Sequence, residues 1–183
     1  MRWRSCGERA GPLPGAHPEA RSAEAFHVSE PIDDLYQDLV LEHKRAPRHF
    51  GPMPAPTHEA RGRNPSCGDD IRVQLQMDGD TLRDIRFTGQ GCAICIASTS
   101  MMAEALHGRD RQAAEDLQRR FRAVLTEGAD PDEAGLGKLV SLAGVGRYPS
   151  RIKCALLGWH ALMHALQQPA GGGAVATLEE PTP

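Results

Sequence analysis

Three features are missing from this sequence of 183 residues, and each absence excludes a class of protein. No run approaches the roughly 20 consecutive apolar residues that a membrane-spanning helix needs. The opening segment, MRWRSCGERAGPLPGAHPEA, lacks the apolar core of a signal peptide. Positive charge is not in excess, because 21 Lys and Arg stand against 24 Asp and Glu. We therefore expect a cytoplasmic protein whose partners are neither membranes nor nucleic acids.

Cysteine is also scarce, with five in the chain. In a reducing compartment, cysteines serve more often as free thiols, metal ligands or nucleophiles than as structural disulfides. The odd number agrees with that view. The positions of the cysteines therefore direct the search for chemistry.

The hydrophobic pattern predicts one domain between two polar ends. Residues 1–28 and 168–183 are rich in Gly, Pro and polar residues without a hydrophobic period, so we expect both to be disordered. Residues 29–167 carry periodic apolar residues in a stretch long enough to bury a core. The predicted fold class is α+β, with a small antiparallel sheet of about three strands and helices packed on one face.

Strands are predicted in the first half of this domain. Ile71, Val73 and Leu75 alternate with polar residues, and Asp78-Gly79-Asp80 turns the chain into a second strand, which predicts a hairpin with one buried face. The preceding segment, HEARGRNPSCGD, is predicted to add a third strand, which Pro65 limits to an edge or a strand end.

Helices are predicted on both sides of the hairpin in the chain. The expected helices are one from Pro31 to APRHFGP, one over Ala93–Leu106, one in RQAAEDLQRRFRAVLTEG, a short one over 130–140, and a last one capped by Ser150.

Three cysteines lie at the predicted element boundaries. Cys67 precedes the hairpin, Cys92 follows it, and Cys154 is expected in the first turn of the last helix, between Arg151, Lys153 and an apolar run. Asp69 lies two residues after Cys67, so that both side chains can face one ion across a flexible glycine. Three thiolates and a carboxylate suit tetrahedral zinc or an iron–sulfur cluster. Helix dipoles are expected to make Cys92 and Cys154 reactive.

A simpler interpretation stays open at this point. A single cysteine is most often a small buried hydrophobic residue, and widely separated ligands are a weaker signal than two paired C-x-x-C motifs. Spacing alone does not decide between packing and metal binding.

Four sequence blocks carry a family resemblance: LYQDLVLEHKRAPRHFG, NPSCGDDIRVQLQ, GQGCAICIASTSMM and RIKCALLGWHAL. Together, over about residues 31–167, they resemble the U-type iron–sulfur assembly proteins (IscU/SufU). The chain is more similar to the SufU branch, because the segment between the second and third cysteine blocks is longer and Lys153 stands where the IscU branch has histidine.

The resemblance implies both a function and a set of site residues. Cys67, Asp69, Cys92 and Cys154 correspond to the family's metal or cluster ligands, and Cys154 to the catalytic cysteine that accepts sulfur. It further implies a sulfur-transfer protein, rather than an enzyme that turns over a small molecule, with Zn²⁺ as its cofactor. Its implied partners are a pyridoxal-phosphate cysteine desulfurase of the SufS type, contacted through Arg151 and Lys153, and downstream iron–sulfur assembly proteins.

Two alternatives use the same residues. One is a scaffold on which a [2Fe-2S] cluster is assembled from iron and transferred, and the absent histidine counts against it. The other is a structural zinc-binding interaction module without sulfur transfer.

Cys95 departs from the family pattern, in which that position is usually a small residue other than cysteine. It lies less than one helical turn from Cys92 and could act as an accessory thiol, by reaching the metal or pairing with Cys92. It could equally be a small packed residue. A thioredoxin-like redox pair is disfavoured because no βαβ pattern surrounds the motif. Cys6, in the polar start, is expected to have no role.

Overall fold

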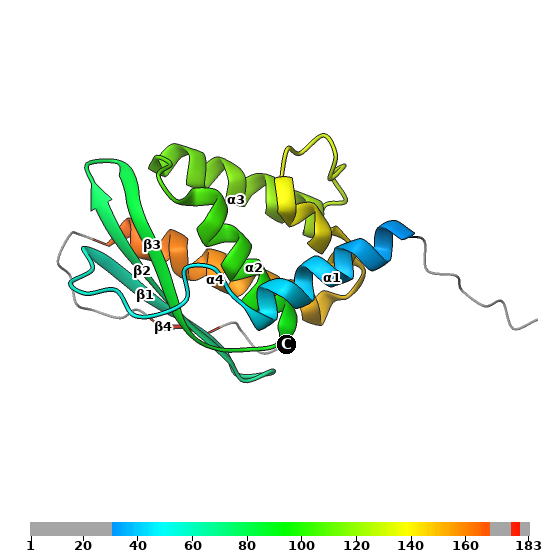
Figure 1. Ribbon diagram of the computed structural model, residues 1–183, viewed down its shortest axis with the longest axis horizontal. Coiled ribbons are helices and arrows are strands. Elements are labelled where there is room, and N and C mark those ends of the chain that lie inside the picture. Colours follow the sequence, from blue (N-terminus) through cyan, green and yellow to red (C-terminus); the bar gives the residue numbers. More distant parts are fainter. Residues whose placement is uncertain (1–30, 169–176, 180–183) are drawn as a thin grey trace, which may run out of the picture.

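The computed structural model describes residues 31–168 and 177–179, with side chains from 37 to 168. The elements follow in the order α1 (Pro31–Arg45), β1 (His58–Asn64), β2 (Asp69–Asp78), β3 (Thr81–Gln90), α2 (Ala93–Leu106), α3 (Arg111–Thr126), the 3-10 helix η1 (Gly137–Arg147), α4 (Pro149–Gln167) and β4 (Thr177–Glu179). The predicted α+β fold is confirmed (Figure 1).

The sheet is built around the predicted hairpin. Its strand order is β3-β2-β1-β4, and both β1 and β3 run antiparallel to β2. Ile71, Val73 and Leu75 are fully buried on one face, as their alternation predicted. The third strand also forms where expected, and it ends at Asn64, directly before Pro65.

A short fourth strand extends the predicted sheet. β4 pairs in parallel with residues 61–63 of β1, so β1 has a neighbour on both sides there. This strand lies inside the segment 168–183, for which the sequence predicted disorder. Residues 169–176 and 180–183 of that segment lie outside the described residues, as does the N-terminal segment 1–28.

The helices cover one face of the sheet, as predicted (Figure 1). α4 packs on β1 and β2, while α2 lies between α1 and α4 and touches β3. Because α2 has neighbours on several sides, ten of its 14 residues are buried, including Ser98, Thr99 and Ser100. Ser98 Oγ donates to the Ala155 carbonyl at 2.7 Å and accepts from Trp159 Nε1 at 3.2 Å, which ties α2 to α4.

The helix predicted over 130–140 does not form. Asp130 Oδ1 accepts a hydrogen bond from the Asp132 N–H at 2.8 Å, which closes a turn. Gly135 and Gly137 follow with φ of +59° and +56°, a left-handed conformation that interrupts a helix. Regular structure resumes only with η1.

The start of α4 also differs from the prediction. Pro149 is its first residue, Tyr148 occupies the capping position, and no side chain caps the helix, so the prediction that Ser150 caps it is wrong. Proline suits this first position because its missing N–H would have no helical partner. Cys154 consequently lies in the second turn of α4 rather than in the first.

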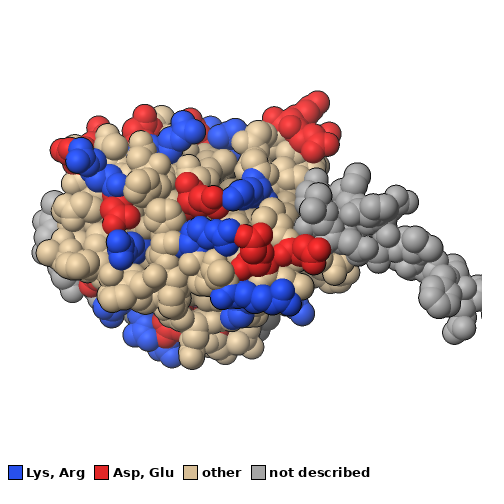
Figure 2. Space-filling view, in the orientation of Figure 1, with Lys and Arg blue, Asp and Glu red and all other residues tan. Residues whose placement is uncertain are grey.

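Charge is mixed over the surface. Figure 2 shows Lys and Arg interspersed with Asp and Glu on one face of the molecule. Several charged residues of the described part of the chain form ion pairs, among them Arg48–Glu42, Lys138–Glu104 and Arg119–Asp116. Among the described helices, none is long and apolar enough to cross a membrane.

Candidate metal centre

The turn between β1 and β2 positions the first two candidate ligands. The N–H of Gly68 donates to the Asn64 carbonyl at 2.9 Å, and Gly68 has φ of +74°, which favours glycine. Cys67 therefore sits exposed on the turn, whereas Asp69 begins β2 and is only 2% exposed. The sequence predicted that these two side chains face the same region, and the structure brings them together.

Cys92 is held between the sheet and α2. Its side chain caps the helix, where Sγ accepts from the Cys95 N–H at 3.5 Å. Its own N–H donates to Asp69 Oδ1 at 2.8 Å. Just before it, the Gly91 carbonyl accepts from Lys44 Nζ of α1 at 2.8 Å. The loop with Cys92 is thus fixed to β2 and α1 together.

Cys154 reaches the same place from α4. Its Sγ lies 3.6 Å from Cys67 Sγ, and one ligand atom each from Cys67, Asp69 and Cys154 all lie within 4.8 Å of one another. Cys92 is not part of this tight set, although its backbone is bonded to Asp69. The structure therefore gathers three of the four predicted ligands and places the fourth beside them.

One oxygen in this cluster is without a hydrogen-bond partner. Asp69 Oδ2 is buried, and no hydrogen bond to it forms among the described residues. An unpaired buried carboxylate oxygen is costly unless a cation or another donor compensates it. Two thiols and one carboxylate oxygen of Asp69, all within 4.8 Å of one another, form a donor set that suits tetrahedral zinc.

Burial changes the electrostatics of two thiols at the site. Burial, followed by the interaction with the nearby Asp69 carboxylate, raises the pKa of both Cys154 and Cys67 above the usual thiol range. Cys154 is 3% exposed and lies in the second turn, where the helix dipole has largely faded. At Cys154 burial therefore outweighs the helix dipole, and a cation is the group that would favour its thiolate.

The remaining predicted residues lie around this cluster. Cys95 is fully buried, and burial, together with the charge of Asp69, raises the pKa of its thiol. Arg151 is exposed on the first turn of α4 and Lys153 is partly exposed. Sequence reasoning missed Lys44, because no spacing rule connects the first helix to the Cys92 loop.

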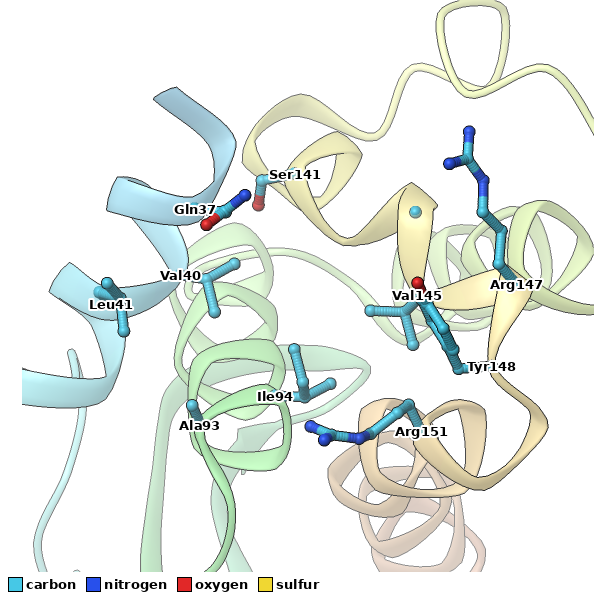
Figure 3. A pocket seen from close by; sticks show the side chains of 11 residues that line it. Gln37, Val40, Leu41, Ala93, Ile94, Ser141, Val145, Arg147, Tyr148 and Arg151 are labelled. Carbon is cyan, nitrogen blue, oxygen red and sulfur yellow. The ribbon is translucent and has the colours of Figure 1, made fainter. Parts of the chain in front are cut away.

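A groove opens where α2 and α4 begin, and it is lined by residues other than the four candidate ligands. It has a volume of about 560 Å³ and lies among α1, α2, η1 and α4. Figure 3 shows Ala93 and Ile94, the two residues after Cys92, on one side and Tyr148 and Arg151 on the other. Tyr148 is 61% exposed, which is unusual for a large aromatic side chain.

Comparison with known proteins identifies the family. Residues 35–155 match the model of the NifU-like N terminal domain. The chain is 36% identical over 141 residues to the zinc-dependent sulfurtransferase SufU of Bacillus subtilis, covering 77% of this chain and 95% of that protein. It is also 36% identical over 139 residues to the iron-sulfur cluster assembly scaffold protein IscU of Streptococcus pyogenes, covering 76% of this chain and 87% of that protein.

A solved structure agrees. An iron-sulfur cluster assembly scaffold protein for the SUF system from Fervidobacterium islandicum AW-1 superposes with a TM-score of 0.67 at 32% identity, covering 71% of this chain and 95% of that one. The resemblance expected from the cysteine blocks is confirmed, since a SufU protein is among these relatives. The chain therefore belongs to the family of NifU-like N-terminal domains, which includes the U-type iron–sulfur assembly proteins IscU and SufU.

Proposed function

We propose that this protein accepts persulfide sulfur from a pyridoxal-phosphate cysteine desulfurase and passes it into iron–sulfur cluster assembly. The acceptor is Cys154, in a zinc site made by Cys67, Asp69, Cys92 and Cys154. The observation that carries the proposal is the convergence of Cys67, Asp69 and Cys154, with one oxygen of Asp69 buried and unpaired. The relative named as a zinc-dependent sulfurtransferase supports this assignment.

Each residue has a role that follows from its surroundings. Bound zinc would supply a positive charge that favours the thiolate forms of its cysteine ligands. Asp69 is the harder donor in this sulfur-rich set, so it is the more weakly held ligand. Asp69 Oδ1 holds the Cys92 loop, because it accepts the 2.8 Å hydrogen bond from the Cys92 N–H.

Sulfur transfer requires Cys154 to become accessible. Cys154 is 3% exposed, and the first turn of α4 covers it, with Ser150 O only 3.7 Å from its Sγ. That turn has no side-chain cap, and Ser150 and Arg151 are exposed, so it is the part of α4 that opens at least cost. The fraying of this turn would expose Cys154 to a partner.

The chemical step is a thiol–persulfide exchange. The Cys154 thiolate attacks the outer sulfur of the desulfurase persulfide, a new S–S bond forms on Cys154, and the old S–S bond breaks. The desulfurase cysteine leaves as a thiolate, so no external oxidant or reductant is needed. Arg151 lines the groove and lies three residues before Cys154 on α4, and Lys153 directly precedes Cys154, so both are proposed as contacts for the desulfurase.

The proposal is tested by desulfurase turnover. Addition of the zinc-loaded protein should raise the rate of cysteine desulfuration, and Cys154→Ala should abolish that increase. Cys6→Ala is the matched control, and it should stimulate as the unsubstituted chain does. Full stimulation by Cys154→Ala would overturn the proposal.

A scaffold role is the second candidate, because the relative from Streptococcus pyogenes carries that name at the same identity. The same ligands would then hold a [2Fe-2S] cluster. Anaerobic addition of iron and sulfide distinguishes the two. A stable chromophore that transfers to an apo-ferredoxin would support the scaffold, and rapid loss of iron in the presence of zinc would support sulfur transfer.

A further inference from the structure

The start of α2 carries two cysteines at a spacing that metal sites use. Cys92 caps the helix and Cys95 is its third residue, with the Cys95 N–H donating to Cys92 Sγ at 3.5 Å. In zinc sites, a C-x-x-C pair commonly supplies two thiolates to one ion. The relevant question is whether Cys95 points toward the cluster or away from it.

Gly91 locates the Cys95 thiol. A Cβ atom placed on Gly91 would lie 3.1 Å from Cys95 Sγ and also 3.1 Å from Asp69 Oδ1. The two atoms therefore flank the same point, where a Cβ would fit only if they shifted by a few tenths of an ångström. Cys95 is fully buried, so its thiol lies on the inner side of the cluster, whereas Cys67 lies on the exposed side.

Sulfur transfer would leave the ion without one of its four ligands. When Cys154 leaves the ion to attack a persulfide, only Cys67, Asp69 and Cys92 remain of the proposed ligands. An ion with three protein ligands keeps an open position, and one of the three here is a carboxylate. The ion is then less tightly held unless another donor is close.

We propose that Cys95 is a reserve ligand, which binds the ion when Cys154 leaves it. Cys95 then joins the two remaining thiolates, Cys67 and Cys92, and Asp69 to complete a four-ligand site, while Cys154 is free to carry sulfur. The unpaired, buried Asp69 Oδ2 is the independent sign that an ion belongs in this cluster, and the other oxygen of the same carboxylate flanks Gly91 together with the Cys95 thiol. This inference rests on the proposed zinc site.

The test measures zinc affinity by competition with a chromophoric chelator, under anaerobic reducing conditions. Four full-length proteins are compared: the unsubstituted chain, Cys154→Ser, Cys154→Ser with Cys95→Ser, and Cys154→Ser with Cys6→Ser. Cys154→Ser should lose no more than about 10-fold in affinity. Adding Cys95→Ser should cost at least a further ~100-fold, the upper end of what an outer-shell partner is worth. Adding Cys6→Ser should cost nothing further.

A second readout guards against misfolding. Loaded with Co²⁺ in place of zinc, Cys154→Ser should show the thiolate-to-cobalt absorption of three thiolates, and the variant that also lacks Cys95 that of two. Thermal unfolding with chelator present should be the same for both proteins. Equal zinc affinity and equal cobalt absorption in the two would overturn the reserve-ligand role. If the unsubstituted chain bound no zinc at all, the proposed function itself would fail.

Discussion

The contact between α2 and α4 positions the cysteines of the site, and at Gly158 it leaves no room for a side chain. A Cβ on Gly158 would lie 2.3 Å from Thr99 Oγ1 and 3.0 Å from both Thr99 Cβ and Cγ2. Thr99 cannot simply rotate away, because its Oγ1 donates to the Cys95 carbonyl at 2.8 Å and its Cβ is part of the clash. Gly158→Ala should therefore push apart the helices that carry Cys95 and Cys154.

The size of the effect follows from these distances. Ordinary contacts begin near 3.4 Å, so the helices must separate by about 1 Å. Overpacking of this kind costs about 2–3 kcal/mol, and alanine returns ~1 kcal/mol through its helix propensity. The net loss is about 1–2 kcal/mol, which for a chain of this size lowers Tm by roughly 2–8 °C. Zinc affinity should fall as well.

Thermal unfolding and chelator competition measure both effects. The matched control is Gly144→Ala, since no described atom lies within 4 Å of the added Cβ, and its Tm should not fall. In a Thr99→Ala background, Gly158→Ala should cost clearly less than in the unsubstituted chain, because two of the three clashing atoms are gone. A Gly158→Ala protein as stable as the unsubstituted chain would refute the reasoning.

Three further predictions concern charge. Asp69→Asn should change the metal-free stability by no more than about 1 kcal/mol, because the amide oxygen of asparagine can still accept from the Cys92 N–H. The substitution should nevertheless speed the transfer of zinc to a chelator, and an unchanged transfer rate would contradict the ligand role of Asp69. Zinc affinity should rise from pH 6.5 to pH 8, because burial raises the pKa of Cys67 and Cys154 and zinc binding must displace their protons. A zinc affinity that calorimetry found to be independent of pH would contradict this prediction. Burial lowers the pKa of His43 below 6.5, so only the unfolded chain readily gains this proton on acidification, and stability is lost as the pH falls below 6.5. Urea denaturation at pH 7.5 and 5.5 should show that His43→Gln loses less stability on acidification than the unsubstituted chain. An equal loss in the two proteins would exclude His43 as a source of the acid destabilisation.

Local patterns predicted most of the fold. Strict alternation around Ile71, Val73 and Leu75 is a period that only a half-buried strand fits. The helix over Ala93–Leu106 was predicted with its observed bounds, because small residues and a following glycine mark its extent. The helix prediction for residues 130–140 failed because an acidic cap followed by proline also suits a single turn. The glycines after it decide that a turn forms instead of a helix.

The site was less predictable than the fold. The proximity of Cys67 and Asp69 follows from their spacing around Gly68. By contrast, Cys154 is 87 residues from Cys67. Their places at element boundaries suggested one ligand set, but spacing alone did not decide it, and the family resemblance gave the stronger support. The structure places their Sγ atoms 3.6 Å apart. Burial of Cys154 could not be predicted, because it depends on where α4 begins, and the sequence offers both Pro149 and Ser150 as a start.

Native mass spectrometry tests the central claim most directly. The protein is purified anaerobically and measured before and after reaction with a cysteine desulfurase and cysteine, and any sulfur adduct is mapped by peptide analysis. We expect one bound zinc at the start, and then the added mass of one sulfur on Cys154. Zinc without any adduct on Cys154, or an adduct that forms equally in Cys154→Ala, would contradict the account.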